Sequence, residues 1–332
     1  ETAGPLREPK SVLLTHRGYT RFQLGRYAEA HEDCDRSLEL DRERSRSHVL
    51  KGLLCLQTKD FSGARKHLDR GVRLDPEKTM GYIARGNLHS AQKEYEKALS
   101  DYDRAIDLDP QLSIAYVNRA NVYRQIHKNE LAMRDIDRAL ELEPNNLLAY
   151  LNRGMLFNAR KDGQSALSDF DQALRIQPRS RRARFGRGMA HMILNQPREA
   201  VQDFNAAYSM GNRSLDLLFR RGRCYYFIKE FEKSVVDIDR VLRTRPNLRG
   251  ANFYRGLSYL ALQKYEKALA DFDSAIAVDP KLARAYKMRA QCRMKMGKTD
   301  GVVEDLRRYL SLSPQAKDRE AIERVIRQKS SR

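Results

Sequence analysis

Small residues recur along this chain at a fixed interval of 34 positions. If each repeat is taken to begin seven residues before its small residue, the repeats start at residues 11, 45, 79, 113, 147, 181, 215, 249 and 283. A period of this length is typical of stacked supersecondary units rather than of one globular core. The small residues at repeat position 8 are Gly18, Gly52, Gly86, Ala120, Gly154, Gly188, Gly222, Gly256 and Ala290.

Three further columns keep the same phase as the first. Position 20 is alanine in seven of the nine repeats, position 24 is mostly large and apolar, and position 32 is proline in seven. Small residues at positions 8 and 20 allow two helices to cross closely, and a large side chain at position 24 fills the gap to a neighbour. Proline stops the second helix. The pattern therefore predicts nine antiparallel helix pairs, each turning near position 15.

These columns resemble the tetratricopeptide repeat family, and the resemblance covers residues 11–314. The family often has tryptophan at position 4, whereas this chain has Tyr82, Tyr116, Tyr150 and Tyr286 there. The resemblance implies an all-α fold, an α-solenoid forming a right-handed superhelix of nine helix-turn-helix repeats. It also implies a concave groove, lined by the first helix of each repeat, that holds peptides.

The same register divides the chain into three parts. Residues 1–10 form a lead-in segment, and residues 11–316 form the solenoid. Residues 317–332 contain Ala321, Ile322, Val325 and Ile326 at helical spacing among charged residues. We expect a C-terminal capping helix and tail there, because an open solenoid end needs a helix with a polar outer face.

Charged residues follow the repeat as well. Position 7 is arginine and position 23 aspartate in eight repeats, and the one exception, Lys51 with His67, lacks both. Since positions 7 and 23 lie at the same height in such a hairpin, we expect an ion pair within each repeat. The alternative is that the arginines line a track for phosphate groups. The recurrent Asp-x-Asp motif is not a metal site, because residues i and i+2 point to different sides of a helix.

Nothing in the sequence points to catalysis. The seven histidines have no metal-ligand spacing, no phosphate-binding loop is present, and we expect no enzyme activity, cofactor or metal. The four cysteines occupy packing positions, which predicts buried free thiols and a reducing intracellular compartment, the cytoplasm. No apolar run is long enough to span a membrane, and no targeting sequence is visible.

Positions 2, 5, 6, 9, 12 and 13 share one face of the first helix and are not needed for packing. In the middle repeats this face presents asparagines, whose amides can hydrogen-bond an extended peptide backbone. An asparagine there is also common across the family. The candidates for partner binding in these repeats are Asn118, Asn121 and Asn152.

In the repeats that begin at residues 181, 215 and 249, the same face is aromatic and basic. Such a composition is typical of protein-binding hot spots, although some of these side chains could instead pack between repeats. We expect Phe227 to pack. The candidates for partner binding are Arg182, Phe185, Met189, Phe219, Arg220, Arg223, Tyr226, Phe253 and Tyr254.

The net charge is concentrated in the second half of the chain. Residues 1–180 carry 30 basic and 27 acidic residues, a net charge of +3, whereas residues 181–332 carry 33 and 17, a net charge of +16. Such a field attracts acidic partners. The leading hypothesis is a scaffold or adaptor that binds an acidic or partly apolar protein segment in its concave groove, as a subunit of a larger assembly. The alternative is association with RNA or a ribonucleoprotein through the basic half.

Overall fold

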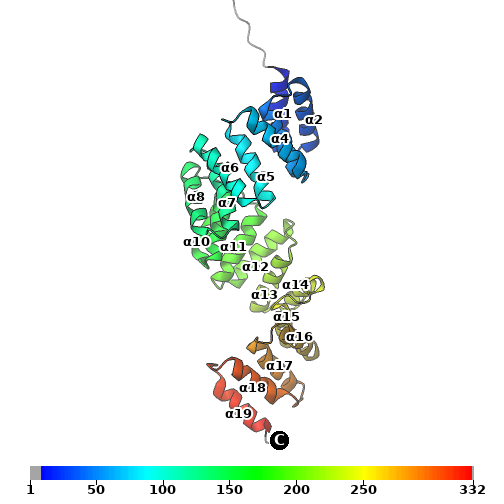
Figure 1. The fold of residues 1–332 in the computed structure, drawn as a ribbon. Helices are drawn as coiled ribbons and strands as arrows, with labels where there is room; N and C mark the ends of the chain where they lie inside the picture. Colours follow the sequence, from blue (N-terminus) through cyan, green and yellow to red (C-terminus); the bar gives the residue numbers. More distant parts are fainter. Residues whose placement is uncertain (1–8, 331–332) are drawn as a thin grey trace, which may run out of the picture. The chain divides into compact units, whose positions relative to one another are not determined.

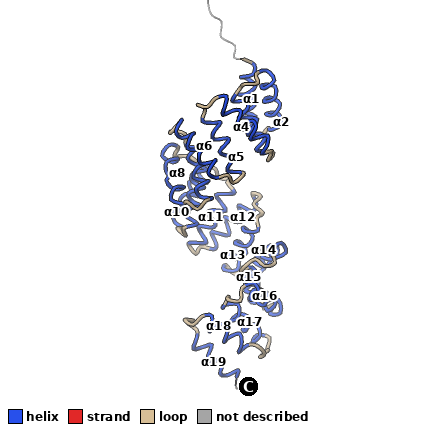
Figure 2. The backbone as a smooth tube through the Cα atoms, in the orientation of Figure 1, coloured by secondary structure: helices blue, strands red, loops and turns tan. Residues whose placement is uncertain are grey.

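The computed structural model describes residues 9–330, and this part of the chain is helical throughout, without strands (Figures 1 and 2). It contains nineteen helices joined by short turns, so the all-α prediction is confirmed. The prediction of a lead-in segment falls largely on residues 1–8, and that of a tail on residues 331–332, which lie outside the described range.

The chain divides into two compact units, one up to residue 156 and one from residue 157 onwards. In the first unit, consecutive helices pack as pairs: α1 with α2, α3 with α4, α5 with α6 and α7 with α8. The helices are α1 (Lys10–Gln23), α2 (Tyr27–Leu40), α3 (Ser45–Gln57), α4 (Phe61–Leu74), α5 (Thr79–Ala91), α6 (Tyr95–Leu108), α7 (Ser113–Gln125), α8 (Asn129–Leu142) and α9 (Leu147–Ala159), which contains the boundary.

The second unit repeats this arrangement, with α11 on α12, α13 on α14, α15 on α16 and α17 on α18. A last helix, α19, packs against α18. The helices are α10 (Gly163–Ile176), α11 (Arg181–Ile193), α12 (Pro197–Ser209), α13 (Leu215–Phe227), α14 (Phe231–Thr244), α15 (Ala251–Ala261), α16 (Tyr265–Val278), α17 (Ala283–Lys295), α18 (Val302–Leu312) and α19 (Arg319–Ser330).

The small residue at position 8 is required by the ring at position 24. A Cβ atom added to Gly86 would lie 2.6 Å from the Tyr102 ring, and one added to Gly188 would lie 2.7 Å from the Phe204 ring. Both rings are almost fully buried. The two helices of a repeat can therefore approach closely only where one of them lacks a side chain.

All nine hairpins turn through a residue with positive φ at position 15. In the first and last repeats this residue is Gly25 or Gly297, whereas the other seven use side chains that rarely adopt this conformation. The prediction of a turn near position 15 is thus confirmed. The seven non-glycine residues, with φ between 56° and 65°, are Lys59, Lys93, His127, Lys161, Asn195, Lys229 and Gln263.

The predicted ion pairs within repeats are confirmed at seven positions. Arg119, for example, donates two hydrogen bonds to Asp135, over 2.8 and 2.7 Å. Its remaining Nη1 donates to Asp103 of the preceding repeat, over 2.6 Å. The sequence interpretation missed this second bond, which ties each repeat to its neighbour. The seven pairs are Arg17–Asp33, Arg85–Asp101, Arg119–Asp135, Arg187–Asp203, Arg221–Asp237, Arg255–Asp271 and Arg289–Asp305.

The eighth expected pair, Arg153 with Asp169, joins residues of different units and stays a prediction. The repeat that lacks both charges is built differently. Lys51 contacts Asp35 of the preceding repeat over 2.5 Å, and His67 instead contacts His48, with 3.0 Å between their Nδ1 atoms. Burial, together with His48, lowers the pKa of His67 to about 4.

The four cysteines are free and buried, as predicted. Burial raises the pKa of Cys34 and of Cys224 to about 12 and that of Cys292 to about 11, so these thiols are protonated at neutral pH.

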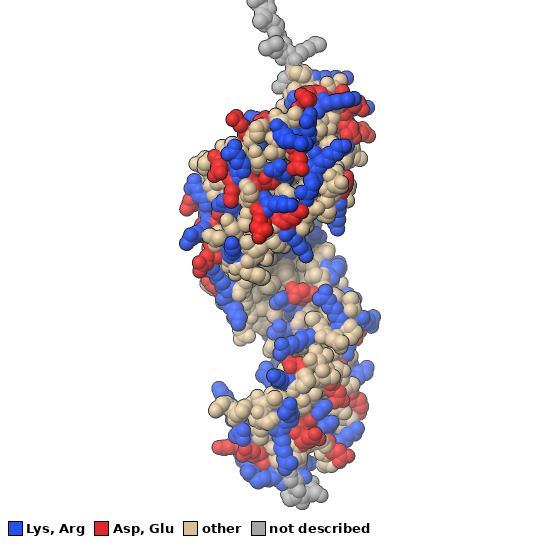
Figure 3. Space-filling model, in the orientation of Figure 1, with Lys and Arg blue, Asp and Glu red and all other residues tan. Residues whose placement is uncertain are grey.

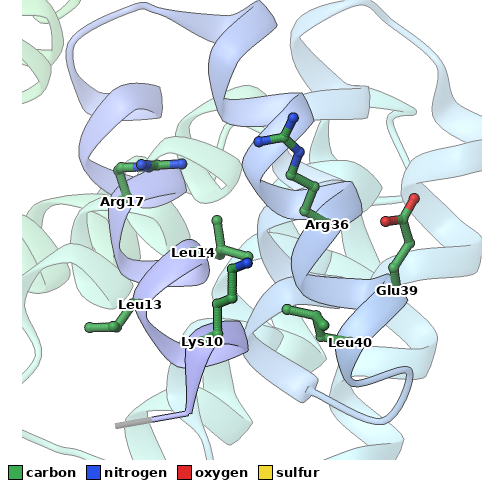
Figure 4. Close-up of a pocket in the computed structure, with 7 residues that line it drawn as sticks. All are labelled: Lys10, Leu13, Leu14, Arg17, Arg36, Glu39 and Leu40. Carbon is green, nitrogen blue, oxygen red and sulfur yellow. The ribbon is translucent and has the colours of Figure 1, made fainter. Parts of the chain in front are cut away.

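The outer face of the first helix pair contains a hollow of about 520 Å³ (Figure 4). Leu13 is 54% exposed there and Leu40 57%. The Arg17 side chain is 53% exposed, whereas its counterparts bond to a preceding repeat.

Candidate functional site

The predicted binding face of the second unit lies on three consecutive first helices, α11, α13 and α15, and the structure adds the first helix of the next repeat, α17. Neighbouring members α13 and α15, and α15 and α17, contact each other directly. Side chains at positions 2, 5, 6, 9, 12 and 13 of α13, α15 and α17 therefore lie next to one another, and we call the face that they form the second-unit groove.

Arg223 is central to the second-unit groove. Its guanidinium carbon lies 4.8 Å from the centre of the Tyr254 ring and 5.8 Å from that of Phe219, both within cation–π range. Among residues 9–330 it forms no ion pair, and its Nε atom is buried without a hydrogen-bond partner. A cation held on aromatic rings without a carboxylate is a ready site for an anionic group.

Tyr254 is the hub of an aromatic cluster beside Arg223. The ring centres of Phe219, Tyr226, Phe227 and Phe253 lie between 5.7 and 6.4 Å from its own, mostly in edge-to-face geometry. Phe227 is 54% exposed. Phe227 packs against the rings of Tyr226 and Tyr254, as expected, but it remains half-exposed because position 13 lies at the end of α13.

A pocket of about 520 Å³ opens next to this cluster. Aromatic and aliphatic side chains form much of its lining, and three basic residues and one carboxylate complete it. Only Tyr226, Phe253 and Tyr254 among its residues were predicted as binding residues. The lining residues are Tyr226, Phe227, Phe253, Tyr254, Leu257, Arg284, Lys287, Met288, Tyr309, Lys317 and Asp318.

Sequence reasoning missed the wall formed by the last repeat. Arg284, Lys287 and Met288 stand at positions 2, 5 and 6 of that repeat, which are positions of the predicted face. The repeat register therefore marks these three residues as part of the binding face. Lys317 and Asp318 follow α18, outside any repeat column, and no periodic signal marks them.

Some charged side chains around the pocket form ion pairs, and others do not. Lys287 contacts Asp318 over 2.5 Å, and the Tyr309 hydroxyl donates to the same carboxylate over 2.7 Å. These bonds lower the pKa of Asp318 and raise that of Tyr309. Arg284 and Lys317 form no ion pair with any residue in the described range. The pocket therefore presents two further cations to a ligand.

Other predicted binding residues of this unit pack in the core or form ion pairs within the fold. Phe185 packs on Phe204, with ring centres 5.7 Å apart, and Met189 lies against the same core cluster. Phe253 is 7% exposed and contacts Phe272. Arg220 is paired with Asp216 over 2.9 Å, and Arg182 is exposed. The structure thus brings together Phe219, Arg223, Tyr226, Phe253 and Tyr254, whereas Arg182, Phe185 and Met189 lie outside that cluster.

Family models described as tetratricopeptide repeat match most of the chain. The matched segments are residues 16–79, 80–112, 117–181, 162–214 and 256–327. The chain belongs to the tetratricopeptide repeat family. Repeats of this family build extended surfaces that serve as protein-interaction scaffolds.

Solved structures show the same fold at low sequence identity. YrrB, described as a repeat protein with an unusual peptide-binding site, is 24% identical with a TM-score of 0.50 over 55% of this chain and 95% of its own. Cut9–Hcn1, a hetero-tetramer of the APC/C, is 13% identical with a TM-score of 0.54 over 98% of this chain and 78% of its own. PilW, a type IV pilus biogenesis factor, is 20% identical with a TM-score of 0.52 over 63% of this chain and 97% of its own. No curated protein sequence matches closely enough to count as a relative.

The candidate asparagines of the first-unit repeats are tied to neighbouring side chains. Asn118 donates to Asn87 over 3.1 Å, and Asn87 also accepts from the Tyr102 hydroxyl. Asn121 accepts from Arg124 over 2.8 Å, and Asn152 is 6% exposed. These tetratricopeptide repeats thus offer polar groups that are already partly satisfied.

Neither a metal site nor a membrane-spanning helix is present among the described residues. No group of three or more histidine, cysteine or acidic side chains in residues 9–330 could hold a metal ion. No helix in that range is both long and apolar enough to cross a membrane.

Proposed function

We propose that this tetratricopeptide repeat protein is a non-catalytic scaffold or adaptor. Its second-unit groove binds an acidic, partly apolar segment of another protein, and the chain acts as a subunit of a larger assembly. The observation that carries this proposal is Arg223, a cation with no carboxylate partner in residues 9–330 that is seated on the Phe219 and Tyr254 rings.

The pocket beside Arg223 supports the same ligand chemistry. Its aromatic lining suits a large apolar side chain, because such anchors contribute most of the binding energy of protein interfaces. The unpaired cations Arg284 and Lys317 suit carboxylates that flank that anchor. Basic side chains are spread over the visible face of the molecule among fewer acidic ones (Figure 3), in agreement with the net positive charge.

RNA association, the alternative raised by the basic second half, gains no support from the matched family or from the similar structures. The arrangement of charge and rings favours a protein segment, because much of the groove is apolar rather than a continuous track for phosphates.

A binding experiment on the full chain tests the proposal. The probe is a fluorescent peptide of about twelve residues that alternates glutamate with phenylalanine and leucine. Arg223→Glu should weaken its binding at least tenfold in fluorescence anisotropy, because the reversed charge repels the carboxylates. The matched control Arg36→Glu, an exposed arginine of α2, should change it less than twofold. Equal binding by both variants would discard the assignment.

A further inference from the structure

Position 4 of the first helix holds a repeated tyrosine contact. In four repeats the tyrosine hydroxyl donates to the carbonyl of the proline that precedes the helix, over 3.1 to 3.2 Å. Its ring lies 5.5 to 5.8 Å from the guanidinium of the arginine at position 7. The four tyrosines are Tyr82, Tyr116, Tyr150 and Tyr286.

The repeat that begins at residue 249 keeps this hydrogen bond but lacks the ring. Asn252 takes the place of tyrosine and donates to the carbonyl of Pro246 over 3.2 Å. A hollow of about 410 Å³ lies beside it, and Arg255 at position 7 is one of its walls. The hollow is lined by Asp239, Leu242, Arg243, Pro246, Asn247, Asn252, Arg255, Ser274, Ala277 and Val278.

Two more small residues open the same hollow. Ser274 stands at position 26, where six of the nine repeats carry arginine. Ala277 stands at position 29, where every other repeat carries Glu, Asp, Arg or Ser. Three neighbouring positions are thus reduced in size in one repeat, which leaves space for a side chain the fold does not supply.

The hollow is lined by one acidic and two basic side chains, Asp239, Arg243 and Arg255, and further arginines lie near it in the sequence. Residues 240–250 contain four arginines and no acidic residue. Arg243, which lines the hollow, has a side chain that is 78% exposed and pairs with Asp239; Arg249, which follows in the same turn, is 81% exposed and pairs with Asp279. These exposed arginines complement carboxylates on both sides of an inserted ring.

We propose that this hollow is a slot for a tyrosine side chain from an acidic segment of a partner protein. The inserted ring takes the place that Tyr82, Tyr116, Tyr150 and Tyr286 occupy in their own repeats, against Leu242 and Val278 and beside Arg255. The slot is separate from the second-unit groove, because it uses positions 4, 7, 26 and 29 rather than the groove positions. A buried tyrosine is a frequent anchor of protein interfaces.

The test uses the full chain with ¹³C-labelled methyl groups and two acidic peptides. One has a central tyrosine flanked by two glutamates on each side, and the other has alanine in place of tyrosine. The methyl resonances of Leu242, Ala277 and Val278 report on the slot. We expect the tyrosine peptide to shift these resonances and the alanine peptide to leave them in place.

Two variants are designed to fill the slot with residues that other repeats carry at the same positions. Asn252→Tyr restores the residue of four other repeats, and Ser274→Arg restores the usual residue of position 26. Both variants should weaken the binding of the tyrosine peptide to the slot at least tenfold. The control Ala270→Tyr adds a tyrosine on the exposed face of α16, at position 22, and should leave binding unchanged.

The proposal is overturned if the tyrosine peptide does not shift the three resonances, or if the alanine peptide shifts them equally. Unchanged binding by Asn252→Tyr or Ser274→Arg also overturns it. None of these results bears on Arg223 and the groove, since the slot residues do not line the groove pocket.

Discussion

At the scale of single residues, the recurrent arginine connects two carboxylates of different exposure. The Asp135 side chain is 9% exposed and bonded twice by Arg119, whereas Asp103 is 53% exposed and bonded once. The inner carboxylate is therefore part of the core of the helix pair, and the outer one is a surface contact between repeats.

We predict that Asp135→Asn lowers the free energy of unfolding by about 3 kcal/mol, because it removes the inner carboxylate charge and leaves Arg119 with only the exposed Asp103 as its partner. Asp103→Asn should lower it by less than about 1 kcal/mol, as for other exposed ion pairs. Urea unfolding followed by circular dichroism measures both. Equal losses would contradict the distinction between inner and outer carboxylates.

His67 predicts a dependence of stability on pH. Its folded pKa of about 4 lies below the ordinary 6.5, so between these values the unfolded chain binds a proton that the folded chain does not. Stability should therefore fall as the pH decreases through this window. His67→Gln should remove part of that loss in thermal melts at pH 7 and pH 5, whereas His127→Gln, in an exposed turn, should not. Identical pH profiles of the two variants would refute this role.

At the scale of elements, the sequence register predicted much of what the structure contains. Positions 8, 20, 24 and 32 predicted the helix pairs, and position 15 their turns, because each of these residues acts inside its own repeat. The bond from Arg119 to Asp103 was not predictable in this way, since it depends on how one repeat stacks on the next. The pocket wall at Lys317 and Asp318 could not be predicted either, because these residues follow the last repeat and occupy no repeat position.

The turn at position 15 can be tested directly. A side chain with positive φ costs about 1–2 kcal/mol, and glycine recovers this at an entropic cost of about 0.5–1 kcal/mol. Lys93→Gly should thus raise the free energy of unfolding by up to about 1 kcal/mol. Ser90→Gly, inside α5, should lower it by a similar amount. If denaturant melts show both variants equally destabilised, the turn conformation carries no strain.

At the scale of the whole molecule, the excess positive charge decides between partners. Nearly all of it lies in residues 181–332. If single-stranded RNA were the ligand, the logarithm of its affinity would fall steeply with the logarithm of salt concentration. We predict no measurable binding of a twenty-nucleotide polyuridine probe in filter assays at about 0.15 M salt. Tight binding with a steep salt slope would favour the RNA alternative.

The two proposed surfaces, the second-unit groove and the tyrosine slot, both lie in helices α13–α17 and their neighbours. Both select acidic segments that carry aromatic or apolar side chains, so one partner could use them together. The groove could be predicted in part from the sequence, since Arg223 and Tyr254 stand at groove positions. The slot was not, because three small residues signal a hollow only when their neighbours are known.

The most direct test of the binding role is zero-length carbodiimide crosslinking of the native assembly, followed by mass spectrometry. This chemistry joins lysines to carboxylates in contact. Our account predicts partner crosslinks at Lys287 and Lys317, whose side chains line the groove pocket. Crosslinks to the partner confined to lysines of the first unit, such as Lys66 and Lys97, would contradict it.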